Sequence, residues 1–312
     1  MGMPKKKPRV VDLFCGCGGL SKGLELAGFE LVGALDKSSK VIECYKNNFS
    51  HLAIEQDLSE IDEAVQKIEA LNPDVIVGGP PCQDFSLAGK RVEGSRAMLT
   101  IQYAKIVQKV RPKYFIMENV AHAQKSDAYK KAKKIFQEAG YALSEQVLDA
   151  SYYGVPQRRK RLVVAGHLNG QHNQFLAKYL SKRASSSPIT VKEVFPDFPI
   201  EFYYRHPRTY DRRAVFSVDE PAPTIRGVNR PRPQNYKSHA NDKSKASNVR
   251  ALSYKERAQI QTFPSSFHWP ELSKSDLEQM IGNAVPVNFA KSIGCSLLDY
   301  INDLESGRAG TK

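Results

Sequence analysis

Apolar and amphipathic stretches alternate along the first half of the chain. Residues 10–14, 31–35 and 74–77 are short, apolar and rich in β-branched side chains, which is typical of buried strands. Apolar residues recur at helical spacing over residues 20–27, and Gly28 follows as a stop signal. The alternation predicts an α/β fold with parallel strands. The other predicted strands are residues 54–57, 114–117, 141–148 and 162–165. Ser38 or Ser39 is expected to cap the next helix and Ser59 the one after it. Two further helices are predicted to begin near Met98 and Tyr129, the last ending at Gly140.

The alternation stops near Asn169 and does not return before Val249. Prolines recur in this segment, and arginines interleave with tyrosines. A disordered linker is one interpretation. Because residues 200–204 and 214–218 have strand character, we favour a small, mostly β insertion that contacts nucleic acid. The expected domains are residues 1–168 with 250–312, and residues 169–249.

Helical patterns resume after this segment. Ser253 and Glu256 form a capping box, and Ser273 or Ser275 is expected to start a further helical turn. Residues 280–286 are predicted to form a tight polar turn. The last helix has an apolar face that we expect to pack on the sheet, formed by Phe289, Ile293, Leu297 and Ile301.

Charge narrows the class of partner. The chain has 46 Lys and Arg against 33 Asp and Glu, a net charge of +13, which favours a polyanion. Nucleic acid is the first candidate, and a membrane surface is the competitor, although no apolar run approaches a spanning length. The basic residues near the start, Lys5 to Arg9, are a localisation signal or, as we favour, a solvated tail.

The cysteines and histidines give no sign of a metal site. Five cysteines without a Cys-x-x-Cys pair, and without a secretory signal, indicate free thiols in a reducing compartment. No His-x-x-x-His spacing occurs, so a zinc site is unsupported. We expect a cytoplasmic protein without a metal.

A glycine-rich turn follows the first strand. Residues 15–20 read Cys-Gly-Cys-Gly-Gly-Leu, but Ser21 stands where a dinucleotide-binding pattern needs its third glycine. Asp36 closes the second strand about 20 residues later, where an acid can bind a ribose diol. An ordinary tight turn is the alternative, and together these features favour a nucleoside cofactor. Asp57 is either a surface acid or a second cofactor contact.

Two strands end on reactive side chains. The turn Gly78-Gly79-Pro80-Pro81 presents Cys82 after the strand at residues 74–77, and Glu118 ends the strand at 114–117. A buried structural cysteine and a helix-capping acid are the alternatives. Neighbouring parallel strands would bring Cys82 and Glu118 into one crevice, where they suit covalent addition to a ring whose nitrogen is protonated.

Cations gather in two connections. The loop at residues 84–96 contains the cations Lys90, Arg91 and Arg96, with Gly89 and Gly94 as hinges, and either closes over a polyanion or is a solvated surface loop. Residues 158–161 read Arg-Arg-Lys-Arg, more charge than solubility requires. Arginine there can contact a phosphate or fix a planar base edge.

In this order and spacing, the motifs resemble those of the DNA (cytosine-5) methyltransferases. The resemblance runs from end to end, so coincidence is excluded in practice. Its motifs are Asp12-Leu13-Phe14-Cys15-Gly16-Cys17-Gly18-Gly19, Pro80-Pro81-Cys82-Gln83, Glu118-Asn119-Val120, Gln157-Arg158-Arg159-Lys160-Arg161, Thr224-Ile225, Thr262-Phe263-Pro264 and Gly282-Asn283-Ala284-Val285-Pro286.

The resemblance implies a Rossmann-like S-adenosylmethionine-dependent methyltransferase sheet and a smaller, mostly β target-recognition domain. Cys82 is then the nucleophile that adds to C6 of a flipped-out cytosine, Glu118 and Arg159 stabilise the ring, and Arg161 supports them. S-adenosyl-L-methionine is the cofactor and S-adenosyl-L-homocysteine its product. The implied cofactor contacts are Phe14, Gly16, Gly18, Gly19, Leu20, Asp36, Lys37, Asp57, Leu58, Pro80, Asn283 and Ala284, and the implied DNA contacts are Gln83, Ser86, Lys90, Arg91, Thr224 and Arg226.

Two positions depart from the family pattern. Lys37 stands where the family usually has an apolar or aromatic residue against adenine, and Val287 replaces a common proline. Amino-directed methyltransferases carry Asn or Asp before Pro-Pro, whereas this chain has Gly79. A tRNA cytosine-5 branch fits less well, because its Cys-Phe-Thr tripeptide is missing. A catalytically silent DNA-binding regulator would lack Cys82 or Glu118, and a dehydrogenase would need the absent third glycine.

The resemblance also sets expectations about partners. The substrate is double-stranded DNA with a specific sequence that the chain does not disclose. We expect a monomer, located in the cytoplasm on the nucleoid, that modifies DNA in a restriction-modification system beside a cognate endonuclease.

Overall fold

The computed structural model describes residues 6–81, 98–207, 209, 212–245 and 249–307, and the chain divides into two units. Unit 1 comprises Met1–Leu148, Lys160–Arg183 and Ala290–Lys312, and unit 2 comprises Asp149–Arg159 and Ala184–Phe289. This division differs from the expected boundaries, since residues 169–183 belong to unit 1 and residues 149–159 and 250–289 to unit 2.

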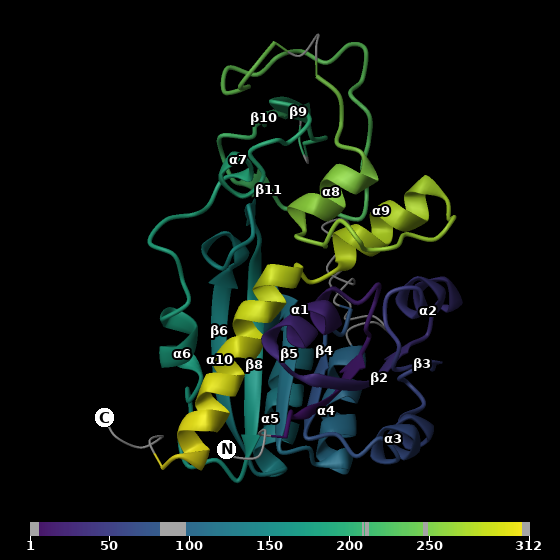
Figure 1. Cartoon of the computed structure of the whole chain (residues 1–312), viewed down its shortest axis with the longest axis vertical. Coiled ribbons are helices and arrows are strands. Elements are labelled where there is room, and N and C mark those ends of the chain that lie inside the picture. The colour runs from purple at the N-terminus through teal and green to yellow at the C-terminus, as the bar shows by residue number, and fades with distance from the viewer. Residues whose placement is uncertain (1–5, 82–97, 208, 210–211, 246–248, 308–312) are drawn as a thin grey trace, which may run out of the picture. The chain divides into compact units, whose positions relative to one another are not determined.

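A seven-stranded sheet organises unit 1, in the order β3-β2-β1-β4-β5-β8-β6 (Figure 1). Neighbours from β3 to β5 run parallel, and β8 is antiparallel to β5. The chain passes from β1 to β2 and β3 on one side and then crosses to β4 on the other side of β1, so the strand order reverses at β1, which is where ligands bind in open α/β sheets. The strands are β1 Arg9–Leu13, β2 Glu30–Asp36, β3 Leu52–Glu55, β4 Val75–Gly78, β5 Tyr114–Val120, β6 Tyr141–Asp149 and β8 Lys160–Leu168.

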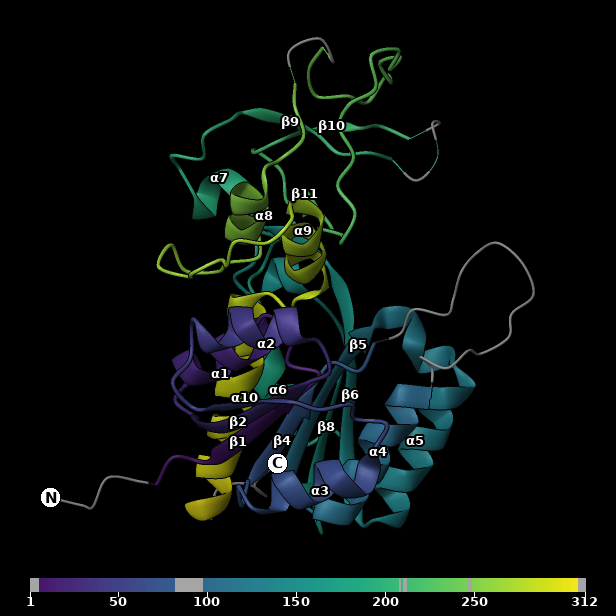
Figure 2. The ribbon, with the colours of Figure 1, turned by 90° about the vertical axis from the view of Figure 1, so that its right-hand side faces the viewer.

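Helices cover both faces of this sheet. Figure 2 shows α3, α4 and α5 on one face and α1 and α10 on the other. The first group encloses an apolar core with the sheet, and α10 packs closely on α1, since a Cβ on Gly294 would lie 2.8 Å from Leu24 Cδ2. The packing predicted for the last helix is therefore confirmed. The helices of unit 1 are α1 Gly19–Ala27, α2 Ser39–Lys46, α3 Ile61–Glu69, α4 Met98–Val110, η1 Ala121–Lys125, α5 Asp127–Glu138, α6 Ala177–Ser181 and α10 Val287–Glu305.

Helix ends test the predicted caps. Gly28 and Gly140 follow α1 and α5 with φ of +111° and +89°, so both predicted stops are confirmed. Ser38 precedes α2, but its side chain makes no capping hydrogen bond. Ser59 does not cap α3, because its N–H and hydroxyl donate to Asp57 Oδ1 and the helix begins after Glu60. The prediction that serines cap these two helices was therefore wrong.

Unit 2 has little regular structure in its described residues. Its strands are short, with β9 antiparallel to β10 and β11 parallel to β7. The capping box of Ser253 and Glu256 opens α8, as predicted, and Ser273 caps α9. Because α9 extends to Asn283, the turn predicted for residues 280–286 was wrong over its first four residues. The elements are η2 Ala150–Tyr152, β7 Gln157–Arg158, α7 Val191–Val194, β9 Phe202–Tyr204, β10 Val215–Ser217, β11 Ala222–Pro223, α8 Tyr254–Ile260 and α9 Lys274–Asn283.

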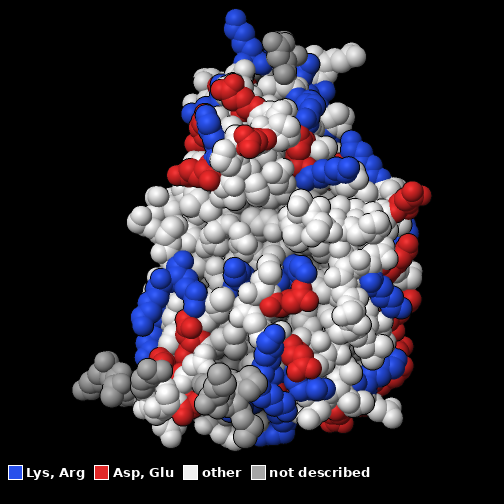
Figure 3. All heavy atoms as spheres, in the orientation of Figure 1, with Lys and Arg blue, Asp and Glu red and all other residues white. Residues whose placement is uncertain are grey.

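The surface carries both signs of charge. Figure 3 shows Lys and Arg side chains interspersed with Asp and Glu on one face. Some lysines of unit 1 are neutralised locally, as in the pairs of Lys109 with Asp62 and of Lys130 with Asp127. Among the described residues, none of the helices combines the length and the apolar character needed to cross a bilayer.

Candidate active site

The turn after β1 is tightly built on one side and open on the other. Phe14, Gly16 and Gly18 have φ of +55°, +54° and +92°. A Cβ on Gly18 would lie 2.3 Å from Phe49 Cε2, so only glycine fits, whereas a Cβ on Gly16 would meet nothing within 4 Å. Backbone atoms are therefore exposed to a ligand at Gly16. Phe14 beside it is half-buried, and Gly19 and Leu20 are buried at the start of α1.

Asp36 faces this turn from the end of β2. Its Oδ2 accepts from Gly16 N at 3.1 Å, and its Oδ1 accepts from Ser38 N at 3.0 Å. Burial raises the pKa of Asp36, while these amides and the positive charge of Lys37 oppose the shift. Lys37 is exposed, and its charge also acts on Asp57. The predicted acid therefore lies at the glycine turn, with a cation next to it.

The side chain of Asp57 is engaged locally. Hydrogen bonds from the Ser59 N–H and hydroxyl, at 2.9 and 2.8 Å, lower the pKa of Asp57. Leu58 between them is buried. Both follow β3, so they lie beyond the same ends of the strands as Asp36.

A buried polar chain lies beneath the turn, and sequence analysis did not assign it to the site. Ser21 Oγ donates to Asp12 Oδ2 at 2.6 Å, and Tyr45 OH donates to Ser21 Oγ at 2.6 Å. Tyr45 OH also lies 2.8 Å from His51 Nε2. Burial raises the pKa of Asp12 to about 7, and the hydrogen bond from Ser21 opposes this shift. The sequence feature that could have identified Asp12 as part of the site is an acidic residue inside an otherwise apolar strand.

The raised pKa of Asp12 predicts a pH-dependent stability. Between its ordinary value of 3.8 and about 7, the folded chain keeps a proton that the unfolded chain releases, so stability falls as pH rises through this window. Relative to Asp12→Asn, the wild type should lose about 2 to 3 kcal/mol of unfolding free energy between pH 5 and pH 8. Urea unfolding at both pH values measures this, and parallel pH dependence of the two proteins would contradict it.

The ends of β4 and β5 bring together the turn that leads to Cys82 and the segment that contains Glu118, as predicted from the sequence. These strands are parallel neighbours, with Gly78 opposite Met117. Asn119 Nδ2 donates to Pro80 O at 3.2 Å, and a Cβ on Gly79 would lie 3.6 Å from Glu118 Oε2. The segment that leads to the nucleophile motif therefore lies against Glu118. Cys82, Gln83, Ser86, Lys90 and Arg91 are outside the described residues.

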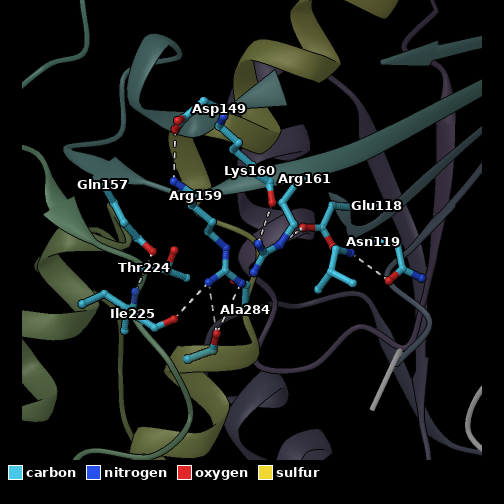
Figure 4. Close-up of polar contacts among 12 residues, drawn as sticks. Glu118, Asn119, Asp149, Gln157, Arg159, Lys160, Arg161, Thr224, Ile225 and Ala284 are labelled. Atoms are coloured by element: carbon cyan, nitrogen blue, oxygen red, sulfur yellow. Dashed lines mark hydrogen bonds and ion pairs between the residues drawn. The ribbon is translucent and has the colours of Figure 1, made fainter. Parts of the chain in front are cut away.

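Glu118 pairs with Arg161 from the adjacent strand β8 (Figure 4). Val120 lies opposite Arg161 in the antiparallel register of β5 and β8. Arg161 Nε is 2.9 Å from Glu118 Oε1, and the two side chains are only 13% and 10% exposed. Since desolvation strengthens this attraction, the pair forms a fixed carboxylate and guanidinium at the strand ends.

Arg159 is placed differently, within unit 2. It is 2% exposed, and its guanidinium donates to the carbonyl oxygens of Ile225 at 3.1 Å and Ala284 at 2.9 Å (Figure 4). It also donates to the carbonyl oxygen of Gly282 at 3.3 Å. The resemblance implies that Arg159 acts on the base with Glu118 while Arg161 supports them, and this remains a prediction. Arg159 ties three segments of unit 2 together.

The remaining candidates of unit 2 make hydrogen bonds to other residues of that unit. Thr224 Oγ1 donates to Arg158 O at 2.7 Å, and Arg226 Nη2 donates to His206 O. Asn283 is exposed, and its Oδ1 accepts from Gln279 Nε2 at 3.1 Å.

In the described part of the chain, no three His, Cys, Asp or Glu side chains are grouped as metal ligands would be.

Comparison with known proteins places these motifs in a family. Residues 8–299 match the family described as C-5 cytosine-specific DNA methylase. The chain is 51% identical over 296 residues to the Type II methyltransferase M.HindV of Haemophilus influenzae, covering 94% of this chain and 97% of that protein. It is 50% identical to the Type II methyltransferase M.HgiDI of Herpetosiphon aurantiacus, with 94% and 95% covered.

Solved structures agree on the fold. The crystal structure of the S. pombe Dnmt2 methyltransferase superposes with a TM-score of 0.70 at 19% identity, covering 95% of this chain and 100% of that one. The predicted α/β methyltransferase sheet is thus confirmed. With its motifs, sheet and near-complete match, the chain belongs to the C-5 cytosine-specific DNA methylase family and is a DNA (cytosine-5) methyltransferase.

Proposed function

We propose that this enzyme methylates C5 of a flipped-out cytosine within a specific double-stranded DNA sequence, through a covalent bond between Cys82 and C6. The observation that carries the proposal is the buried pair of Glu118 and Arg161 beside the Gly79-Pro80 segment, two residues before Cys82. A carboxyl and a guanidinium at this position suit the N3 and O2 atoms of cytosine. When both atoms are held in this way, a thiolate can add at C6.

The chemistry follows from the electronic structure of the base. C5 of cytosine is a poor nucleophile until a thiolate has added at C6, and the Cys82 thiolate supplies that electron pair. The Glu118 carboxyl holds the proton at N3, and Arg161 donates to O2, so the ring gains nucleophilic character at C5. Loss of the C5 proton after methylation expels Cys82. The cytosine must leave the stack, because the faces of C5 and C6 are covered within the duplex.

We assign different roles to the two arginines than the resemblance implied. The contacts of Arg161 with Glu118 favour Arg161 as the arginine that acts on the base. The guanidinium of Arg159 is occupied by carbonyl oxygens of unit 2, which favours a structural role.

The residues around the glycine turn fit S-adenosylmethionine, which supplies an electrophilic methyl group on a sulfonium. The open backbone at Gly16 accommodates a ligand without steric conflict. Asp36 would bind the ribose hydroxyls, and Phe14 with Leu58 would give apolar contact. Gly18, Gly19 and Leu20 would shape the turn, Pro80 would lie near the methyl donor, and Lys37, Asp57, Asn283 and Ala284 would complete the set of contacts.

Unit 2 would carry the target-recognition domain over most of residues 169–249. Thr224 and Arg226 would contact DNA there, and Gln83, Ser86, Lys90 and Arg91 would do so from the segment around Cys82. The names of the two Type II relatives support a role in a restriction-modification system with a cognate endonuclease. We further propose a monomer that acts on the nucleoid in the cytoplasm.

Methyl transfer from labelled S-adenosylmethionine tests this function. Double-stranded DNA and bulk tRNA are offered separately, and the DNA product is converted with bisulfite and sequenced. We expect label in DNA alone, as 5-methylcytosine in one sequence context. Label in tRNA alone, or methylation of an exocyclic amine, would overturn the proposal.

A further inference from the structure

The segment Arg226 to Arg230 of unit 2 has its backbone pressed against α9. A Cβ on Gly282 would lie 2.2 Å from Arg226 C and 2.2 Å from Gly227 N. A Cβ on Gly227 would lie 2.5 Å from Gln279 Oε1. Because a side chain at Gly282 would collide with the backbone of Arg226 and Gly227, the segment packs directly on the backbone of α9, and the end of the Gln279 side chain covers Gly227.

A buried ion pair holds this segment at Arg226 and at Asn229. Arg257 of α8 and Glu278 of α9 are 3.5 Å apart, with side chains 3% and 6% exposed. Arg257 Nη2 donates to Arg226 O, and Asn229 Nδ2 donates to Glu278 Oε1 at 2.7 Å and to Leu252 O at 2.8 Å. Each partner of the pair therefore fixes one end of a four-residue span.

Two side chains of the segment are presented outward. Val228 is 63% exposed, and Arg230 is also exposed. Arg230 also lines a surface pocket together with Arg205, His206 and Arg226. Burial and the charges of Arg230 and Arg226 lower the pKa of His206, so Arg230 directs its charge towards this pocket.

The pocket selects for hydrogen-bond acceptors. The residues that line it in the described part of the chain include four arginines and no acid. Cytosine N4 and adenine N6 present donors in the major groove, whereas guanine presents the acceptors O6 and N7, which match the fork of an arginine. A phosphate is also an acceptor, but an exposed valine beside the arginine suits a base edge or a thymine methyl group better than a charged oxygen.

We propose that Arg226 to Arg230 is a sequence-reading segment, in which Arg230 recognises a guanine and Val228 packs on the neighbouring base, while Arg257 and Glu278 are positioning residues. This inference rests on the proposed function, because it assumes DNA as substrate. A fixed backbone matters here, since discrimination between bases depends on the direction of each hydrogen bond.

The test of Arg230 uses a duplex library with random bases around one cytosine. Wild type, Arg230→Ala and Arg230→Lys are incubated with S-adenosylmethionine, and methylated molecules are read by bisulfite sequencing. Arg230→Ala should lower the preference for guanine at one position by about 10- to 100-fold, with the other positions unchanged. Lys237→Ala removes an exposed cation of the same unit outside the pocket and should keep the wild-type motif.

Asn229→Ala tests the positioning step without breaking the buried ion pair. It removes the hydrogen bonds to Glu278 and Leu252, so Val228 and Arg230 lose their fixed direction. We expect lower discrimination at the position that Arg230 reads, with cofactor affinity and melting temperature close to wild type. Selectivity is informative here, because a general loss of stability lowers all rates without changing the sequence motif.

Two outcomes would overturn the inference. A uniform loss of methylation across all sequences in Arg230→Ala, with a weaker salt dependence of DNA binding, would make Arg230 a phosphate contact. An unchanged motif and rate would exclude any role in DNA contact. Failure of the proposed function is distinguishable, since the wild type would then produce no 5-methylcytosine in the library.

Discussion

Replacing Cys82 by serine is expected to lower the rate of methyl transfer to DNA by at least about 10³-fold. A serine hydroxyl is ionised far less than a thiol near neutral pH and cannot add to C6 at a useful rate. Binding should persist, because the variant keeps the size of the side chain and the Glu118 and Arg161 pair. Single-turnover kinetics with labelled S-adenosylmethionine and a DNA-binding titration measure the two effects separately.

Cys295→Ser provides the matched control. Cys295 is half-buried in α10 and has no part in the proposed chemistry, so its replacement should leave the rate near wild type. A covalent DNA adduct should form with wild type on DNA containing 5-fluorocytosine, in which fluorine replaces the C5 hydrogen and cannot leave as a cation, and should not form with Cys82→Ser. Substantial turnover by Cys82→Ser would refute the covalent mechanism.

The positions of the strand ends were predictable from sequence. Buried strands read as short apolar runs, and the carboxyl ends of parallel neighbours meet at one edge. The Gly79-Pro80 segment and Glu118 therefore had to lie close together once β4 and β5 were neighbours. The same reasoning placed Asp36 at the glycine turn, because β2 pairs with β1.

Contacts between distant segments were not predictable in the same way. Arg159 and Arg161 are two residues apart, which is the spacing that puts side chains on the same side of an extended segment, so sequence alone does not say which one meets Glu118. Arg159 instead contacts carbonyls 66 to 125 residues away. Arg257 next to a recognised capping box likewise meets Glu278 only because α8 and α9 pack together.

Local hydrogen bonds also competed with the predicted helix caps. Ser59 has a side chain that can cap a helix, and it lies one residue before Glu60, the N-cap residue of α3. Asp57 accepts both of its donors, so the serine stabilises an Asx-type turn instead of the helix. Side chains of Ser and Asp offer several such local partners, and sequence patterns do not rank them.

Replacing Arg159 and Arg161 by lysine, one at a time, should distinguish a structural role of Arg159 from a catalytic role of Arg161. In Arg159→Lys, one ammonium cannot reach the three carbonyl oxygens that the planar guanidinium serves, and buried acceptors are left without donors. The melting temperature should fall by roughly 5 to 10 °C. In Arg161→Lys the charge beside Glu118 is kept, so stability should change little, but the directed donation to the base is lost.

Arg161→Lys is therefore expected to lower kcat about 10- to 100-fold, while Arg159→Lys should retain most of its activity well below its melting temperature. Thermal unfolding and single-turnover kinetics on the same preparations give both quantities, with Lys160→Arg as a control at the exposed position between them. The reverse pattern, a catalytic defect in Arg159→Lys at unchanged stability, would restore the roles implied by the resemblance. Because the two arginines are only two residues apart, a general disturbance of residues 159–161 would affect both variants alike and cannot produce either pattern.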